Sequence, residues 1–185
     1  NDDLKACQRN NAKMPQVAHF NDYFRDVVKG KTSDFDVQAK GYATGNLFQA
    51  HDMPSALCAN TLNKEMYKIY QQPTQSINYV ECHDNATSWD KMKDCCKDEV
   101  REIRVKRQKL MIAVTLVAQG VPFLQSGQEF CRTKYGYHNT YNAPDNVNQI
   151  DWERKNRHNE VVEFTRDCLR LRKLIRAFRF ASAEE

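Results

Sequence analysis

The chain has 185 residues, of which 28 are Lys or Arg and 24 are Asp or Glu, so its formal net charge is +4. Hydrophobic residues make up 41% and charged residues 28%, a composition typical of one globular core. No apolar run approaches the roughly 20 residues of a membrane helix, and +4 is too small to indicate nucleic-acid binding. We therefore expect a globular domain with no membrane and no nucleic-acid partner.

The first third of the chain predicts one strand and two helices. Residues 17–20 form a short apolar run that predicts a buried strand. Asn21-Asp22 can cap a helix that Gly30 ends. Apolar residues then recur at helical spacing over residues 55–70. The pattern so far is a strand followed by helices.

The remaining two thirds repeat this order twice. Residues 77–82 predict a second strand, and residues 98–118 predict a long helix whose second half is apolar on nearly every side. A third strand is expected at residues 121–124 and a last helix at residues 156–177. Repeated strand-helix units predict an α/β fold with a parallel sheet, either doubly wound or closed into a barrel.

Polar clusters follow all three predicted strands. They are Asn21-Asp22, His83-Asp84-Asn85 and Gln128-Glu129. Parallel folds place their chemistry at the carboxyl ends of the strands, so these clusters are the candidate functional positions. Taken alone, a His-Asp-Asn cluster is more often a capping turn than a catalytic site, and Gln128-Glu129 is more simply structural.

The cysteines give no metal or redox motif. There are seven, an odd number, and none forms a CxxC pair; this argues against a zinc ribbon or a redox centre. We expect free thiols in a reducing compartment, hence a cytoplasmic location, with secretion as the alternative. His83-Asp84 as a metal pair would need further ligands that the other histidines do not supply at suitable spacing, so no metal site is predicted.

Three segments, in order along the chain, carry a resemblance to a known family. Residues 17–30 read VAHFNDYFRDVVKG, and residues 77–91 read INYVECHDNATSWDK. Residues 119–152 contain QGVPFL, GQEF, RTK, YNAPD and NQIDW. These segments resemble the sixth, seventh and eighth strand regions of type I pullulanases, debranching enzymes of the α-amylase superfamily. The resemblance spans nearly the whole chain and departs from the family pattern at Ala86 and Ser88, where leucines are usual.

The resemblance implies a partial (β/α)8 TIM barrel that runs from the sixth strand to the eighth helix. Residues 1–180 would be the C-terminal portion of the catalytic barrel, and residues 181–185 would begin a linker or tail. A complete barrel takes about 250 residues. The nucleophile and the acid/base of this superfamily follow its fourth and fifth strands, whose motifs are absent from this sequence, so both are expected upstream.

The resemblance also implies a retaining hydrolase of α-1,6 branch linkages in pullulan, glycogen or limit dextrins. Asp84 would be its transition-state stabiliser, and the substrate-binding residues would be His83, Asn85, Trp89, Tyr141, Asn142 and Asp145. Aromatic side chains such as Trp89 suit the apolar face of glucose, although loop aromatics pack on their own loop about as often. The implied partners are a branched α-glucan and the missing N-terminal half of the barrel.

Two readings of the chain remain open on these residues. In the first it is part of a debranching glycosidase and inactive alone; in the second it is an α-glucan-binding piece that does not cleave. We expect no cofactor, and no pattern in the sequence decides whether calcium binds.

Overall fold

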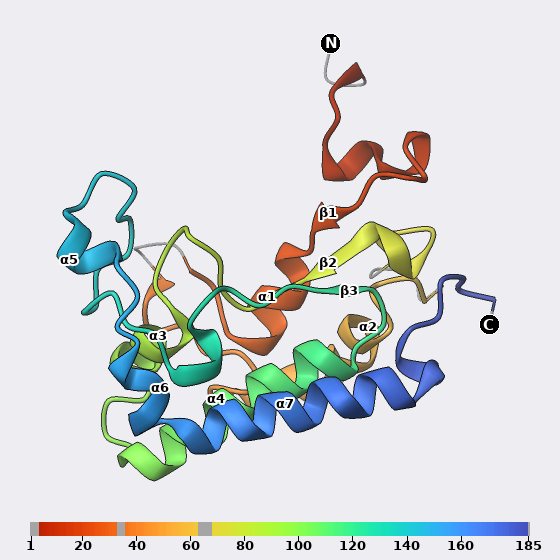
Figure 1. Cartoon of the computed structure of the whole chain (residues 1–185). Coiled ribbons are helices and arrows are strands. Elements are labelled where there is room, and N and C mark those ends of the chain that lie inside the picture. Colours follow the sequence, from red (N-terminus) through yellow and green to blue (C-terminus); the bar gives the residue numbers. More distant parts are fainter. Residues whose placement is uncertain (1–3, 33–35, 63–67, 185) are drawn as a thin grey trace.

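The structure is a computed structural model that describes residues 4–32, 36–62 and 68–184. Its centre is a three-stranded parallel sheet of β1 (His19–Phe20), β2 (Ser76–Asn78) and β3 (Val121–Pro122) (Figure 1). The strands lie in sequence order: His19 is opposite Ser76, and Ile77 is opposite Val121. The predicted parallel α/β arrangement is confirmed.

The first strand leads directly into α1 (Asp22–Val28). Asn21 is the N-cap, and its side-chain oxygen accepts a hydrogen bond from the Phe24 amide at 3.0 Å. Gly30 follows the helix with φ +101°, and a Cβ atom there would lie 2.3 Å from the Ala39 carbonyl oxygen. Only glycine fits this position, which explains why the helix ends where the sequence predicts.

The helix predicted at residues 55–70 is much shorter. In the structure α2 spans Met53–Leu57, and Ala59 and Asn60 have φ values of 56° and 53°. Two consecutive left-handed residues cannot continue a right-handed helix. Residues 63–67 of that prediction lie outside the described residues.

The sequence patterns did not predict α3 (Ser88–Cys95), which follows the loop after β2. Thr87 caps this helix by accepting the Asp90 amide at 3.1 Å. The remaining helices are α4 (Arg101–Val117), α5 (Asp145–Asn148), α6 (Glu153–Arg157) and α7 (Asn159–Leu174). Short 3-10 helices are η2 (Gln8–Lys13), η4 (Leu47–His51), η5 (Pro73–Gln75), η6 (Gln128–Phe130) and η7 (Arg176–Phe178).

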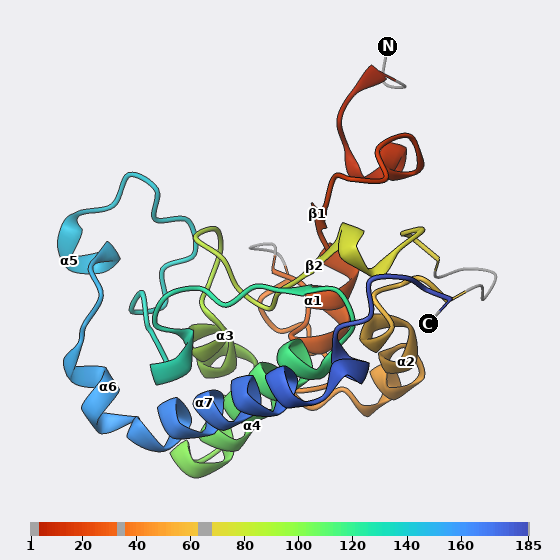
Figure 2. The same cartoon turned by 45° about the vertical axis from the view of Figure 1, so that its right-hand side comes forward.

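The core lies between the sheet and the helices on one side of it. In both views α4 and α7 run side by side beneath the sheet (Figures 1 and 2). Phe24 and Val28 of α1, Met92 of α3 and Ile112 of α4 are fully buried there, and so is Val161 of α7. None of the described helices combines the length and apolarity needed to cross a membrane.

One buried cation connects α7 to the sheet. Arg172 is 8% exposed, and its guanidinium donates to the carbonyl oxygens of Leu116, Ala118 and Gly120 at 2.7 to 2.8 Å. These carbonyls end α4 and lead into β3. A helix leaves its last carbonyls without intrahelical partners, so Arg172 fixes the turn from α4 into the third strand.

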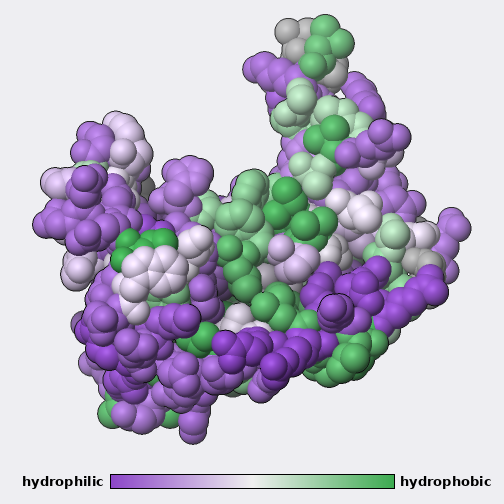
Figure 3. Space-filling model, viewed as in Figure 1, coloured by the Kyte–Doolittle hydropathy of each residue, from purple (hydrophilic) through white to green (hydrophobic). Residues whose placement is uncertain are grey.

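The first strand is more exposed than its apolar sequence predicts. Val17 and Phe20 are 43% and 44% exposed, so the expectation of a buried strand at residues 17–20 is wrong. The Phe20 ring packs edge-on against Tyr79 and Phe123 at centroid distances of 4.9 and 5.2 Å. Hydrophobic residues accordingly gather over the middle of this face of the molecule (Figure 3).

Candidate functional site

The carboxyl ends of β1 and β2 meet in a charged network. Arg25 on α1 donates through Nη1 to Asp22 Oδ1 at 2.8 Å and to the Tyr79 hydroxyl at 2.7 Å. The Tyr79 hydroxyl in turn donates to Asp22. Burial and the bond to Asp22 raise the pKa of Tyr79 well above its usual value. This network joins the first strand's helix to the end of the second strand, so Asp22 and Arg25 hold the two segments together.

His83, Asp84 and Asn85 occupy the loop directly after the second strand. His83 Nε2 lies 3.3 Å from Asp84 Oδ1, and the two side chains are 85% and 60% exposed. Asn85 adopts φ 58°, a left-handed conformation that asparagine tolerates better than most residues. This tight turn presents the imidazole and the carboxylate together to solvent.

Asp84 and Asn85 line a pocket of about 240 Å³ at this edge of the sheet. The pocket is also lined by Asp22, Arg25, Lys29, Thr32, Tyr79, Glu81 and Cys82. Its walls carry both signs of charge and several hydroxyl or amide groups. Such walls suit a neutral, hydroxyl-rich ligand, because each hydroxyl can donate to a carboxylate and accept from a cation.

Two buried ionisable groups lie deeper in the same pocket. Lys29 and Glu81 are each 1% exposed. Burial lowers the pKa of Lys29 to about 8 despite the nearby Glu81. Burial also raises the pKa of Glu81, against hydrogen bonds from the Ser88 hydroxyl and amide that lower it. Neither group belongs to a polar cluster of the sequence, although the glutamate inside the apolar run at residues 77–82 is a signal that could have found one.

Trp89, one of the predicted substrate residues, is buried in the core. Its side chain is 6% exposed and packs edge-on against the His158 ring at 5.4 Å, with the Arg104 guanidinium 5.4 Å from the indole centre. Trp89 lies in the first turn of α3, a helix the sequence did not predict, and helical geometry turns it into the core. The expectation that Trp89 stacks on a sugar is therefore corrected.

The remaining predicted substrate residues, Tyr141, Asn142 and Asp145, lie together in a separate segment. Tyr141 is 80% exposed, and Asn142 is exposed beside it in the segment that leads into α5. Asp145, the first residue of α5, is exposed as well. This segment projects on the same side as the loop that precedes α3 but away from the sheet (Figures 1 and 2). None of these three residues lines the Asp84 pocket, so the predicted substrate residues form two groups.

Gln128 and Glu129 have local structural roles. Gln128 is fully buried and accepts from the Gln125 amide at 3.3 Å. Glu129 accepts from the Gly127 amide at 3.0 Å. Both carboxamide and carboxylate shape the turn after β3, which agrees with the structural reading of this cluster.

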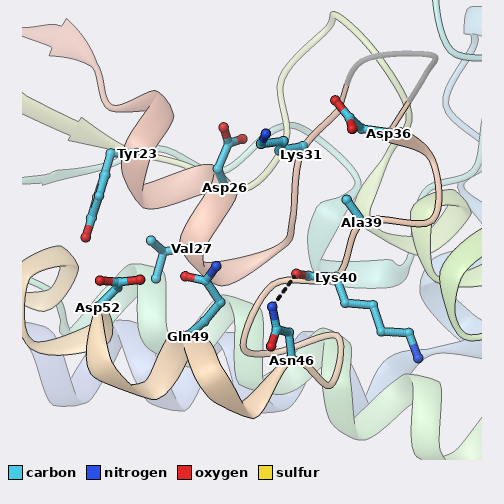
Figure 4. Close-up of a pocket in the computed structure, with 10 residues that line it drawn as sticks. All are labelled: Tyr23, Asp26, Val27, Lys31, Asp36, Ala39, Lys40, Asn46, Gln49 and Asp52. Carbon is cyan, nitrogen blue, oxygen red and sulfur yellow. Dashed lines mark hydrogen bonds between the residues drawn. The ribbon is translucent and has the colours of Figure 1, made fainter.

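A second and larger pocket, of about 450 Å³, lies between α1 and the η4–α2 segment (Figure 4). Asp26 and Lys31 line its upper side and Gln49 and Asp52 its lower side. The predicted site residues are absent from its lining, so this pocket is distinct from the candidate site. Among the described residues, no group of three or more His, Cys, Asp or Glu could hold a metal ion. All seven cysteines have free thiols.

Comparisons with known proteins decide the family. No family model matches the chain. A pullulanase of Bacillus subtilis (strain 168) is 44% identical over 181 residues, which cover 98% of this chain and 25% of that protein. The crystal structure of pullulanase type I from the same organism, complexed with maltose, superposes with a TM-score of 0.95 at 43% identity. The chain belongs to the pullulanase family.

Two further proteins are similar to this chain. The apo pullulanase of Paenibacillus barengoltzii has a TM-score of 0.95 at 37% identity and covers all of this chain. A glycogen operon protein GlgX homolog of Mycobacterium tuberculosis is 25% identical over 138 residues, or 59% of this chain. The chain spans about a quarter of the length of the Bacillus pullulanase.

Proposed function

We propose that this chain is part of a retaining debranching enzyme that hydrolyses α-1,6 branch linkages of pullulan, glycogen or limit dextrins. The observation that carries the proposal is the 44% identity to a pullulanase across 98% of the chain, together with an accessible Asp84 at the carboxyl edge of the parallel sheet. Crystal structures of related pullulanases complexed with maltose, maltotriose and maltotetraose support a linear or branched glucan as the ligand class.

In this proposal the three strands are the last three of a (β/α)8 barrel. Three parallel strands do not close a barrel, and β1 and β3 each have one neighbour among the described strands. A barrel's remaining strands would pair with those free edges. The apolar surface around Phe20, which is 44% exposed, supports such a neighbour.

The proposed chemistry needs three carboxylates. Retaining glycosidases use a nucleophile and an acid/base about 5 Å apart, and we assign both to residues outside the present sequence. Asp84 would accept hydrogen bonds from sugar hydroxyls that strengthen as the ring distorts toward an oxocarbenium ion. His83, 3.3 Å from the same carboxylate, would contact a neighbouring hydroxyl, and Asn85 holds the turn that presents both.

Asp84→Asn in the full-length protein tests the assignment. The substitution keeps the shape of the side chain and removes its charge, so turnover of pullulan should fall by orders of magnitude while glucan binding stays nearly unchanged. Asp98→Asn is the matched control, because Asp98 is an exposed carboxylate in the turn between α3 and α4. Unchanged turnover in Asp84→Asn would refute the role of Asp84.

Experiments on the same full-length protein also distinguish the proposed function from the alternative, which is glucan binding without cleavage. Pullulan binding with no reducing sugar released by the full-length protein would favour it. Hydrolysis by residues 1–185 alone would contradict the assignment of the nucleophile and acid/base to sequence outside this chain.

A further inference from the structure

Lys134 is buried where a lysine side chain would ordinarily be solvated. It belongs to the Arg-Thr-Lys motif after β3 and is 1% exposed. Its Nζ donates to the carbonyl oxygen of His83 at 3.2 Å and to that of His138 at 2.9 Å. One ammonium group therefore touches the backbone of two loops that are separated by more than fifty positions in the sequence.

These loops carry both groups of predicted substrate residues. The Asp84 loop, residues 82–87, contains the His83 carbonyl that Lys134 contacts. The Tyr141 loop, residues 135–148, contains the His138 carbonyl and presents Tyr141 and Asn142 three and four positions later. Asn148, the last residue of α5, donates through Nδ2 to the carbonyls of Thr140 and Ala143 at 2.7 and 3.2 Å, so the segment around Tyr141 is held against α5.

The backbone of Lys134 is fixed as firmly as its side chain. Its amide donates to Asp90 Oδ2 at 2.6 Å, and the preceding Thr133 hydroxyl donates to Asp90 Oδ1. Asp90 is fully buried in the first turn of α3. The backbone of Lys134 is therefore fixed to α3 through Asp90, and its side chain reaches from there to both loops.

Burying the Lys134 ammonium group costs free energy, which its hydrogen bonds to the loop carbonyls offset. Burial, with the nearby Arg132, lowers the pKa of Lys134, while Asp90 and Glu81 oppose the shift. A buried cation is retained where its hydrogen bonds satisfy groups that would otherwise be unpaired. Here those groups are two loop carbonyls, and a second buried lysine, Lys29, approaches the Ala86 carbonyl at 3.5 Å on the other side of the Asp84 turn.

We propose that Lys134 is a positioning residue that couples the Asp84 loop to the Tyr141 loop, so that the two groups of glucan contacts keep one relative geometry. The inference rests on the proposed function only for what the loops bind. Lys134 acts through backbone carbonyls and does not itself touch the sugar. Small displacements of such contacts are costly, because a shift of about 1 Å can lower a rate by about a hundredfold.

The test compares Lys134→Met with Lys93→Met in the full-length protein. Both substitutions remove an ammonium near Asp90, but Lys93 Nζ bonds to the Asp90 carboxylate at 3.1 Å and to the Thr133 hydroxyl, and reaches neither loop carbonyl. Hydrogen exchange measured by mass spectrometry should become several-fold faster in peptides covering both loops of Lys134→Met, with α4 and α7 unchanged. In Lys93→Met neither loop should change.

Kinetics add a second readout, and Lys134→Arg adds a conservative variant. Lys134→Met should lower kcat/KM for pullulan tenfold to a hundredfold, and Lys134→Arg, which keeps a donor cation, should recover part of both the exchange protection and the activity. If Lys134→Met does not fold, Lys134→Gln, whose side chain is shorter and uncharged but keeps N–H donors, replaces it in the same comparison.

The outcomes separate this inference from the proposed function. Faster exchange in one loop only, or in both loops of Lys93→Met as well, would overturn the coupling whatever the enzyme hydrolyses. A wild-type protein without glucan hydrolysis would overturn the proposed function, while the exchange result would still decide whether Lys134 joins the loops.

Discussion

Asp90 offers a quantitative test of how the candidate site is held together. Its carboxylate is 0% exposed and accepts from four donors. Oδ2 accepts from the Thr87 hydroxyl at 3.0 Å and the Lys134 amide at 2.6 Å, and Oδ1 accepts from Lys93 Nζ at 3.1 Å and the Thr133 hydroxyl. Asp90→Ala removes all of these acceptors and leaves the Lys134 amide buried without a partner.

The expected cost follows from which donors can find another acceptor. Lys93 is 42% exposed and can turn to solvent, and the two hydroxyls can rotate. The buried amide cannot, and an unpaired buried donor together with the lost charge-assisted bonds amounts to about 3 kcal/mol of unfolding free energy. For a chain of this size that lowers Tm by about 6 to 12 °C. Asp90→Asn keeps one oxygen for the amide and should cost about half as much.

Urea denaturation at pH 7 measures these free energies directly. Asp94→Ala is the control, because Asp94 lies on the same helix, is 37% exposed and contacts only His138 at 3.7 Å among the ion pairs of the described residues; it should change stability by less than about 0.5 kcal/mol. A loss below about 1 kcal/mol in Asp90→Ala, or an equal loss in Asp90→Asn, would refute the reasoning.

Two further predictions concern buried cations. Arg172→Met leaves three backbone carbonyls without their donor and should lower the free energy of unfolding by about 3 kcal/mol. The control, Arg170→Met, breaks an exposed ion pair with Asp167 and should lower it by almost nothing. Equal urea midpoints for the two variants would contradict this prediction. The pKa of Lys29 is about 8 in the folded chain and 10.5 when solvated. The folded state therefore loses this proton first, and stability should rise by about 3 kcal/mol between pH 8 and pH 10.5. Lys29→Met should lack that rise, so parallel stability curves for the two proteins would show that the lysine is not buried as described.

Features that rest on local rules could be predicted from the sequence. The Asn21 cap, the glycine end at Gly30 and the long helices α4 and α7 follow from capping chemistry and apolar periodicity. The parallel order of the strands follows from repeated strand-helix units. The place of Asp84 at the carboxyl edge of the sheet then follows from topology.

What escaped prediction depends on burial of polar side chains. Helix α3 buries Ser88, Asp90 and Lys91, so it lacks the apolar periodicity by which a helix is recognised, and Trp89 was consequently placed on a loop. Lys29 and Lys134 were missed for a related reason. The sequence does not distinguish a lysine that bonds to a distant carbonyl from a solvated lysine. Only the tertiary structure does.

The hydrogen bonds of Lys134 also affect which changes in loop length this region can accommodate. A loop held by β-ladder hydrogen bonds shifts register when a residue is inserted. His83 and His138 are instead held by the long side chain of Lys134, whose backbone amide is bonded to Asp90 of α3. Because the side chain contacts one carbonyl in each loop, an insertion that leaves both contacts in place can change the rest of the Tyr141 loop without moving the turn that carries Asp84.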